Sequence, residues 1–289
     1  MSRLLRRASA GLAPQPWPGP PTVTGDLRRV VSVVDAAVTA RALVSVVGPR
    51  GSGKSVAVRE ALRGLDCAVV EPVRLDRDRL HLGDIAAAIV ADLSEERPRR
   101  SGEARSRQVR RILGAASRRR PVALAVDDAH RLHYRTAVGL KRLLELAWMG
   151  RAPLLAIVLV GQSDRAAAIP EVGRRADRVV LAGLSGAEAR EAASRAMRPS
   201  ADAPLIGDAA LERLVADPRS RNWLDLADLL DRSLAASRAR EGAIRISAAD
   251  VRLALGDAPA APAAPSGAPP EAAVAEALRQ RRERRTAAA

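Results

Sequence analysis

The chain has 289 residues, of which 47% are hydrophobic, so it can build a core and is not a disordered basic chain. Its formal net charge is +15, and its single cysteine excludes an internal disulfide or a cysteine-based zinc cluster. No apolar run reaches the roughly 18 residues of a membrane span, and no apolar signal core follows the basic N-terminus. We therefore expect a soluble, cytoplasmic protein without a membrane partner.

The predicted elements alternate between helices and strands in the first two thirds of the chain. Residues 1–24 are basic and rich in proline, which predicts a flexible arm. Apolar residues at three- and four-residue spacings predict the helices, and short apolar, β-branched runs predict the strands. In chain order these are helix 25–41, strand 42–47, helix 55–65, strand 67–73, helix 82–93, basic helix 103–118, strand 122–126, helix 136–148, strand 154–160 and strand 178–181.

The remaining third of the chain shows only helical patterns, at 185–197, 207–216, 222–239 and 248–255. Because the predicted strands are apolar on both faces, they indicate a parallel sheet covered by helices on both sides. The expected fold class is therefore α/β. We predict an α/β core at 25–183, a small helical unit at 184–256, and a disordered Ala/Pro linker with a basic tail at 257–289.

A phosphate-binding motif lies between the first predicted strand and the second predicted helix. Gly48-Pro49-Arg50-Gly51-Ser52-Gly53-Lys54-Ser55 fits G-x-x-x-x-G-K-[ST]. Its glycines allow a loop that surrounds an anion with backbone N–H groups, and the following helix, which includes Val56, directs its positive dipole end at phosphate. In such a loop Lys54 reaches the β- and γ-phosphates, and the Ser55 hydroxyl binds Mg²⁺. The motif predicts ATP and Mg²⁺ as ligands.

Two acidic residues follow the buried strand 122–126. Asp127 directly after the strand is predicted to hold Mg²⁺, directly or through water, and Asp128 to orient the attacking water. The alternative for such a pair is a helix N-cap, which suits Asp128 better than Asp127.

With this pair of motifs, and with Asp127-Asp128-Ala129-His130-Arg131-Leu132 as the second, residues 25–255 resemble the AAA+ ATPases. The nearest resemblance is to transposition regulators of the phage Mu B, TnsC and IstB-like type and to their ExeA-like relatives. The resemblance implies a five-stranded sheet of order 5-1-4-3-2, a helical lid at 184–256 and a nucleotide at a boundary between subunits. It also implies a catalytic Glu where this chain has Asp128, whose shorter side chain leads us to expect slow hydrolysis.

Three further roles come from this resemblance alone. Gln162 follows the fourth strand where the family has a polar sensor residue. Arg175 resembles the arginine finger that reaches a neighbour's γ-phosphate, with Arg174 and Arg178 as competitors. Arg221 in the lid resembles a second sensor that contacts the nucleotide. Each of these can instead be an ordinary turn or surface residue.

The positive charge is concentrated in one segment before the strand 122–126 and in the two tails. Residues 97–120 contain ten Arg and one Glu, and both tails are basic. Such a surface attracts polyanions, of which nucleic acid is the commonest large one, although a solvated helix face is the alternative. With one Tyr, three Trp and no Phe, base stacking on single strands is not expected. The candidate contacts to duplex DNA are Arg77, Arg79, Arg105, Arg107, Arg110 and Arg111.

The function that we predict from these features is an ATP-dependent, sequence-independent DNA-binding ATPase that assembles as a filament or ring and regulates a transposase. The alternatives are an ExeA-like or signalling ATPase that remodels a protein without DNA, a nucleotide-gated scaffold with negligible turnover, and a helicase-loader-type ATPase.

Overall fold

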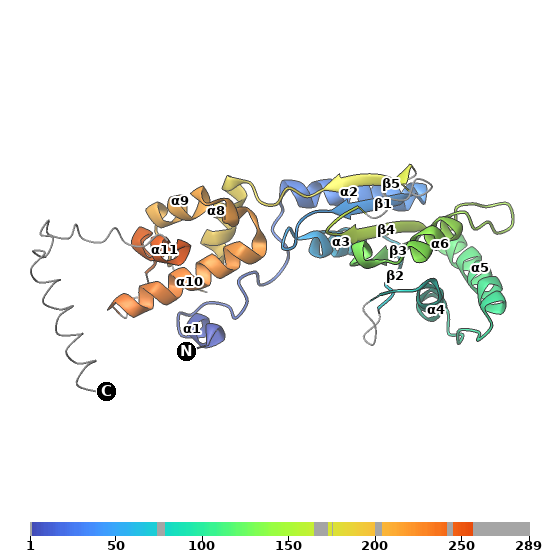
Figure 1. Cartoon of the computed structure of the whole chain (residues 1–289), viewed down its shortest axis with the longest axis horizontal. Helices are drawn as coiled ribbons and strands as arrows, with labels where there is room; N and C mark the ends of the chain where they lie inside the picture. The colour runs from blue at the N-terminus through green and yellow to red at the C-terminus, as the bar shows by residue number, and fades with distance from the viewer. Residues whose placement is uncertain are drawn as a thin grey trace, which may run out of the picture.

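The computed structural model describes residues 2–73, 79–164, 173–174, 176–199, 204–241 and 245–256. Two lobes lie side by side along the long axis of the molecule (Figure 1). One is an α/β core built on a sheet, and the other is a helical lid. The chain passes between the lobes twice, once after α1 and once after β5.

The core contains a five-stranded sheet in which every described strand pair is parallel. The strands are β1 (Leu43–Val47), β2 (Ala68–Val70), β3 (Val122–Val126), β4 (Ala156–Gly161) and β5 (Ala176–Val180). Their order is β2-β3-β4-β1-β5, which confirms the predicted order 5-1-4-3-2. The register pairs Val47 of β1 with Gly161 of β4, and Val126 of β3 with Leu159 of β4, so the strands that carry the two motifs end near one edge of the sheet.

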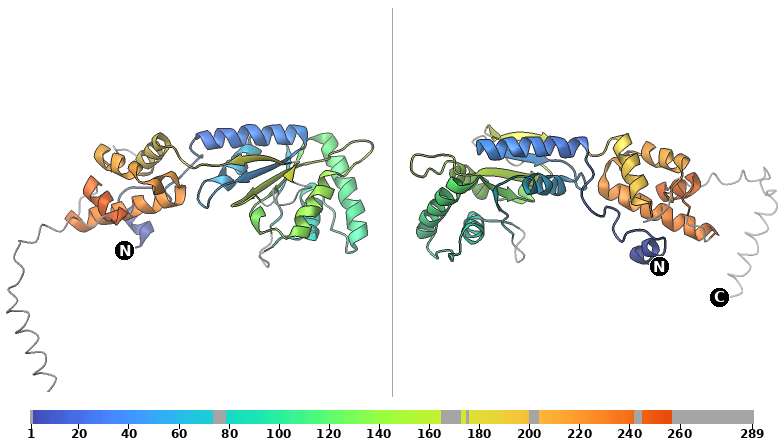
Figure 2. Two further views of the ribbon diagram at one scale, coloured as in Figure 1. Left: turned by 45° about the horizontal axis from the view of Figure 1, so that its top comes forward. Right: turned by 180° about the vertical axis from the view of Figure 1, so that it is seen from behind.

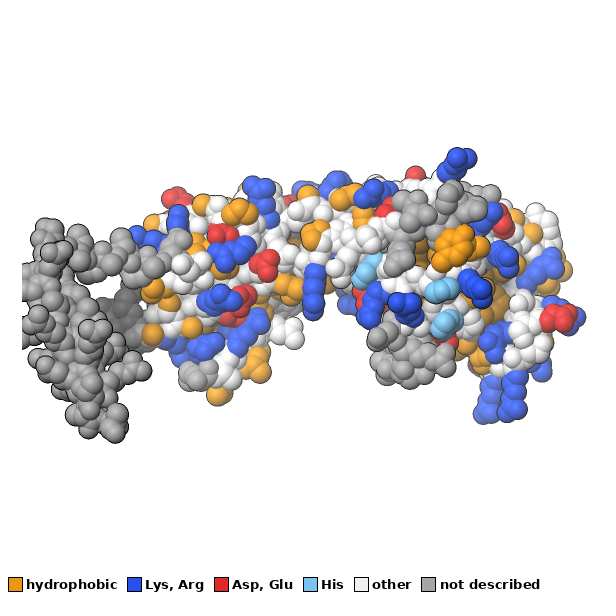
Figure 3. Space-filling model, in the orientation of Figure 1, with side chains coloured by type: hydrophobic (Ala, Val, Ile, Leu, Met, Phe, Trp, Pro, Cys, Tyr) orange, Lys and Arg blue, Asp and Glu red, His pale blue; other side chains and the backbone are white. Residues whose placement is uncertain are grey.

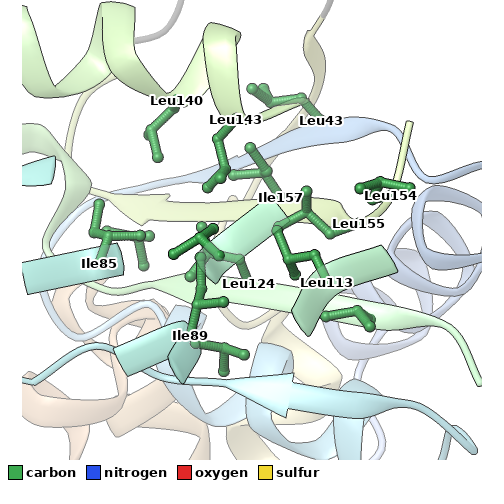
Figure 4. Close-up of a cluster of buried hydrophobic side chains, with 14 of the residues drawn as sticks. Leu43, Ile85, Ile89, Leu113, Leu124, Leu140, Leu143, Leu154, Leu155 and Ile157 are labelled. Atoms are coloured by element: carbon green, nitrogen blue, oxygen red, sulfur yellow. The ribbon is translucent and has the colours of Figure 1, made fainter. Parts of the chain in front are cut away.

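Helices cover both faces of this sheet because the strand side chains alternate between two hydrophobic clusters. Side chains of α4 (Leu82–Leu93), α5 (Gly102–Arg119) and α6 (Tyr134–Leu144) pack on one face. Figure 4 shows the leucine and isoleucine side chains of this cluster. The other face packs against α2 (Gly25–Ala40) and α3 (Lys54–Arg63). The chain has no phenylalanine, and its core is built mainly from Leu, Val, Ile and Ala side chains.

The predicted helix 136–148 differs from the observed one at its end, since α6 stops at Leu144. The next residues form a turn in which Trp148 and Arg151 make an isolated antiparallel bridge. Trp148 packs on Gly114 of α5 so closely that a Cβ there would lie 2.2 Å from its Cγ atom. The missing side chain at Gly114 therefore makes room for the indole, which a continued helix would carry elsewhere.

The lid consists of α8 (Gly186–Ala196), α9 (Asp208–Ala216), α10 (Trp223–Glu241) and α11 (Ala248–Leu255), with a hydrophobic cluster of its own. Capping boxes fix two of its helix starts, with Ser185 and Glu188 at α8 and Ser247 and Asp250 at α11. None of the described helices is both long and apolar enough to cross a membrane.

The N-terminal segment differs from the predicted flexible arm. It begins with a short helix, α1 (Arg3–Ala8), which lies against the lid, and then runs along the molecule to α2 (Figure 2). Ala10 and Leu12 are buried in the lid cluster, and the Arg7 side chain is 1% exposed. The proline-rich composition concealed this contact because the buried residues are few and aperiodic.

Candidate functional site

The phosphate-binding motif forms a tight loop between β1 and α3. The Gly48 N–H donates to the Gly161 carbonyl at 3.3 Å, which joins the loop to the end of β4. Gly51 and Gly53 have φ angles of +80° and +89°, which other residues adopt only with strain. A Cβ on Gly48 would lie 2.9 Å from the Ser52 hydroxyl oxygen. A side chain at any of these three glycines would therefore strain the backbone or crowd a neighbouring atom.

Lys54 is the first residue of α3, and its ammonium group lies over the loop. Its Nζ donates to the Pro49 carbonyl at 2.7 Å and to the Ser52 hydroxyl at 3.4 Å. Burial lowers the pKa of Lys54, and the nearby carboxylates of Asp127 and Asp128 oppose this shift. Ser55 and Val56 follow in the first turn, where helix N–H groups are free of intrahelical partners.

The two acidic residues follow β3 at the same edge of the sheet. The Asp127 carboxylate accepts a hydrogen bond from the Asp128 N–H at 2.8 Å. Asp128 has a φ of +50°, a left-handed conformation that Asp and Asn tolerate better than most residues. It occupies the N-cap position of the short helix η1 (Ala129–Arg131), yet its side chain makes no capping bond there. Its carboxylate is 68% exposed and faces His130 across 3.9 Å, so the capping alternative does not explain it.

These residues line one cavity of about 1070 Å³. Gln162, predicted as a sensor, lies on its wall with Lys54, Ser55, Asp127 and Asp128. The sequence did not single out several other lining residues. They come from the N-terminal segment and from the lid, and include Trp17, Thr22, Arg195 and Trp223. His130 and Arg131, which belong to the second motif, also line the cavity from η1.

Two tryptophans from distant parts of the sequence meet beside this cavity. The rings of Trp17 and Trp223 lie 4.9 Å apart and nearly perpendicular, at 82°. This edge-to-face contact joins the N-terminal segment to the first residue of α10. The sequence analysis did not predict this contact, and the scarcity of aromatic residues was a signal that could have drawn attention to the three tryptophans.

The lid meets the phosphate loop through Asn222 and Trp223 rather than through the predicted Arg221. The Asn222 side chain donates to the Arg50 carbonyl at 2.6 Å, and the Trp223 N–H donates to the Gly51 carbonyl at 3.0 Å. Arg221 is exposed and does not line the cavity; its carbonyl accepts from the Leu184 N–H at 2.8 Å. In this conformation its contribution is a backbone contact that holds the connection between core and lid.

Among the arginine-finger candidates, Arg175 lies outside the described residues. Arg174 is exposed just before β5. Arg178 lies within β5, where its guanidinium is 3.6 Å from the Asp164 carboxylate. The Asp164 side chain is 8% exposed and also accepts from the Ser45 hydroxyl at 3.0 Å, so Arg178 contacts a carboxylate that is already bonded to β1.

The candidate DNA contacts fall into two groups. Arg105 donates to the Arg99 carbonyl at 2.8 Å, and Arg110 donates to the Ala147 carbonyl at 2.6 Å and lies 5.7 Å from the Trp148 ring centre. These two stabilise the structure around α5. Arg107 and Arg111 lie on the outer face of α5 in exposed ion pairs with Glu103 and Glu96. Arg79 is exposed, and Arg77 lies outside the described residues.

Figure 3 shows Lys and Arg side chains over the visible face of the core, several of them at the end away from the lid. Arg107, Arg111 and Arg118 share the outer face of α5 because they are spaced four and seven residues apart. This face is one part of the predicted basic surface that is exposed and open to a polyanion.

The comparisons with known proteins agree with this geometry. Residues 38–169 match the AAA domain family. No curated protein has a significant match to the chain.

Solved structures resemble most of the chain at low sequence identity. Cdc6p from Pyrobaculum aerophilum is 18% identical with a TM-score of 0.59, over 86% of this chain and 70% of that one. The Aeropyrum pernix ORC1 protein, solved in complex with DNA, is 19% identical with a TM-score of 0.56, over 84% and 69%. The Thermotoga maritima RuvB Holliday junction branch migration motor is 20% identical with a TM-score of 0.51, over 81% and 69%. The chain therefore has the α/β fold of the AAA+ P-loop NTPases, and the part that matches the AAA domain family is residues 38–169.

Proposed function

We propose that this protein binds Mg²⁺-ATP in the cavity between core and lid and hydrolyses it. The observation that carries this proposal is the convergence of Lys54 and Ser55 at the start of α3 with Asp127 and Asp128 at the end of β3, all lining one cavity. The loop N–H groups and Lys54 would bind the phosphates, and Asp128 would orient water. Gln162 would contact the γ-phosphate.

The donor set fits magnesium. A serine hydroxyl and an aspartate carboxylate are hard oxygen ligands, which Mg²⁺ uses together with phosphate oxygens and water. The described residues contain no group of three or more His, Cys, Asp or Glu that would form a closed protein metal site. Ser55 and Asp127 would therefore hold an ion that arrives with the nucleotide, and that ion would neutralise phosphate charge.

The second part of the proposal is sequence-independent binding to duplex DNA through the outer face of α5. Arg107, Arg111 and Arg118 support it, since their guanidinium groups lie on one exposed face. The resemblance in fold to the ORC1 protein solved in complex with DNA and to the RuvB branch migration motor is consistent with this role. Assembly into a filament or ring, with Arg175 reaching a neighbour's nucleotide, belongs to the same proposal.

The finer role that we propose is regulation of a transposase, which rests on the motifs of the sequence. The resemblance to Cdc6p and ORC1 favours a second candidate, an ATPase of the helicase-loader type. Both roles require ATP-dependent assembly on DNA. An ExeA-like ATPase that remodels a protein partner would need no DNA.

One experiment separates these candidates. The protein is incubated with duplex DNA and ATP, ADP or a non-hydrolysable ATP analogue and imaged by negative-stain electron microscopy. Filaments or rings that form on DNA only with ATP or the analogue support the proposal, and Lys54→Ala should abolish them. A protein that binds nucleotide but no DNA at low salt would overturn the DNA-binding part and favour the protein-remodelling alternative. Added transposase or replicative helicase then separates the two finer roles by which one is recruited.

A further inference from the structure

The phosphate-binding loop is fastened to the lid through two of its carbonyl groups. The Asn222 amide donates to the Arg50 carbonyl at 2.6 Å, and the Trp223 N–H donates to the next carbonyl, that of Gly51, at 3.0 Å. Both lid residues stand at the start of α10, so one helix end holds two successive peptide groups of the loop. The lid thus contacts the loop backbone itself.

The lid lies so close to the loop that a side chain at Gly51 or Gly53 would crowd it. A Cβ on Gly51 would lie 2.1 Å from the Asn222 side-chain oxygen, and one on Gly53 would lie 3.2 Å from the Trp223 indole nitrogen. A distance near 2.1 Å is far inside van der Waals contact, and Asn222 could relieve it only by moving. These glycines therefore serve the lid contact as well as the curvature of the loop.

The two ends of the Asn222 side chain have separate partners. Its oxygen accepts from the N–H groups of Leu224 at 2.9 Å and Asp225 at 3.3 Å, which caps α10. Its amide nitrogen donates to the Arg50 carbonyl. The orientation of α10 is thereby tied to the position of one loop peptide.

The N-terminal segment also packs on Trp223. Trp17 packs edge to face on Trp223, with ring centres 4.9 Å apart. Trp223 thus lies between Trp17 and the loop glycine Gly53. Because Trp17 also packs against the lid cluster, the two rings move with the lid, and motion of the lid away from the loop would break the contact of Trp223 with Gly53.

We propose that Asn222 is a positioning residue that couples phosphate binding to the docking of the lid. The C=O and N–H groups of a trans peptide point in opposite directions. Holding the Arg50 and Gly51 carbonyls on the lid side therefore fixes the directions of the Gly51 and Ser52 N–H groups. A phosphate that orders this loop would strengthen lid docking, and by linkage a docked lid would strengthen phosphate binding. This inference rests on the proposed binding of ATP.

Two substitutions test the hydrogen bond that the Asn222 amide donates to the Arg50 carbonyl. Asn222→Asp and Asn222→Ser both keep an oxygen that caps α10, and both lose the amide that reaches Arg50. Only the first adds a charge, so an effect common to both comes from the lost donor. We expect each to weaken binding of a fluorescent ATP analogue by roughly twofold to tenfold, the usual range for one lost hydrogen bond. Thermal unfolding should show that both variants remain folded.

Hydrogen exchange followed by mass spectrometry provides the readout that a merely structural role would not move. In the wild type, Mg²⁺ and a non-hydrolysable ATP analogue should slow exchange in the peptide that covers the start of α10. In both variants this protection should be lost at nucleotide concentrations that saturate the site, while protection of the phosphate loop remains.

Protection of α10 that persists in both variants would overturn the coupling and leave the ATP-binding proposal intact. A folded wild type that binds no nucleotide would overturn the proposed function and the coupling with it. Gly51→Ala tests the contact from the other side, because its methyl group displaces Asn222. Its effect on lid protection should not add to that of Asn222→Ser, since both break the same contact. Gly150→Ala is the matched control, with a similar φ of +75° and nothing within 4 Å of the added Cβ.

Discussion

Arg7 and Asp231 lie 224 residues apart in the sequence and form a buried ion pair, with Nη1 and Oδ1 at 2.9 Å. Their side chains are 1% and 6% exposed. Arg7 also donates to the Ala196 carbonyl at 3.0 Å and to the Ala13 carbonyl at 2.7 Å. This single guanidinium joins α1 to α8 and α10. The N-terminal segment is thereby held on the lid, and from there it runs along the cavity to the core.

Replacing Arg7 should destabilise the lid strongly. Arg7→Met leaves Asp231 buried without its main partner, which costs about 3–5 kcal/mol of unfolding free energy for a buried pair. Arg3 contacts the same carboxylate with a side chain that is 49% exposed, so Arg3→Met should cost no more than about 1 kcal/mol. Urea denaturation of the two variants measures the difference. Equal losses would show that burial of Arg7 has no special role.

The affinity for ATP should fall as the pH rises through the range in which Lys54 loses its charge. Burial lowers the pKa of Lys54, so its charge is lost at a lower pH than that of an ordinary lysine, and a neutral amine attracts phosphate less. Titration of a fluorescent ATP analogue at several pH values measures this dependence. In the Lys54→Arg variant, whose guanidinium stays charged, the affinity should be lower or equal at neutral pH and nearly flat with pH. The same slope in both proteins would assign the titration to another group.

The lowered pKa of Lys54 also predicts the pH dependence of stability without nucleotide. Its pKa in the folded state lies below that in the unfolded state, so the unfolded chain binds more protons between the two values. Stability from this group therefore increases as the pH rises through that window. The free energy of unfolding is measured for the wild type and for Lys54→Met at neutral and alkaline pH. The value for the wild type should rise relative to that of the variant as the pH rises.

Asp128→Asn should stop hydrolysis while sparing nucleotide binding. Loss of a group that orients and activates water typically lowers the rate by about 10²–10⁴-fold. Asn is nearly isosteric and tolerates the φ of +50° at this position, so the fold should be kept. Phosphate release at saturating ATP measures the rate. A variant with wild-type turnover would remove Asp128 from the mechanism.

Asp128→Glu tests whether the short side chain makes hydrolysis slow. A longer carboxylate that reaches the water should raise the rate, although Glu fits a left-handed backbone less well than Asp. Turnover of the wild type and of Asp128→Glu is therefore compared at saturating ATP, and the thermal stability of both proteins is measured as well. A well-folded Asp128→Glu variant that hydrolyses no faster would contradict the explanation from side-chain length.

Charge reversal on the outer face of α5 should weaken DNA binding without affecting nucleotide binding. The double variant Arg107→Glu and Arg111→Glu removes two exposed cations. The negative slope of log affinity against log salt should therefore become shallower by about 2. Fluorescence anisotropy of a labelled duplex at several salt concentrations measures it. Arg252→Glu, on the exposed side of α11 in the lid, is the control, and it is compared with the single variant Arg107→Glu because each changes the net charge by the same amount. Equal weakening by the control would indicate a diffuse electrostatic attraction without a defined surface.

The elements of the core and the candidate catalytic centre could be predicted from the sequence because their signals are local. The interval from Gly48 to Ser55 requires particular residues at fixed spacing, and Asp127 directly follows a run of apolar residues that can only be a buried strand. The order of the sheet was implied by the resemblance to AAA+ ATPases, which rests on the two motifs, and the structure confirms that order.

Only the tertiary structure decided which residues meet across the cavity. Arg221 and Asn222 are neighbours in the sequence, yet the side chain that reaches the phosphate loop is that of Asn222, because the start of α10 faces the loop there. Arg105 and Arg107 carry the same charge, but one is bonded to the backbone and the other lies open on the surface. Local periodicity and motif spacing therefore determined the elements and the phosphate-binding centre. Contacts such as Arg7 with Asp231 depend on the three-dimensional packing of distant segments, for which a single sequence carries no local signal.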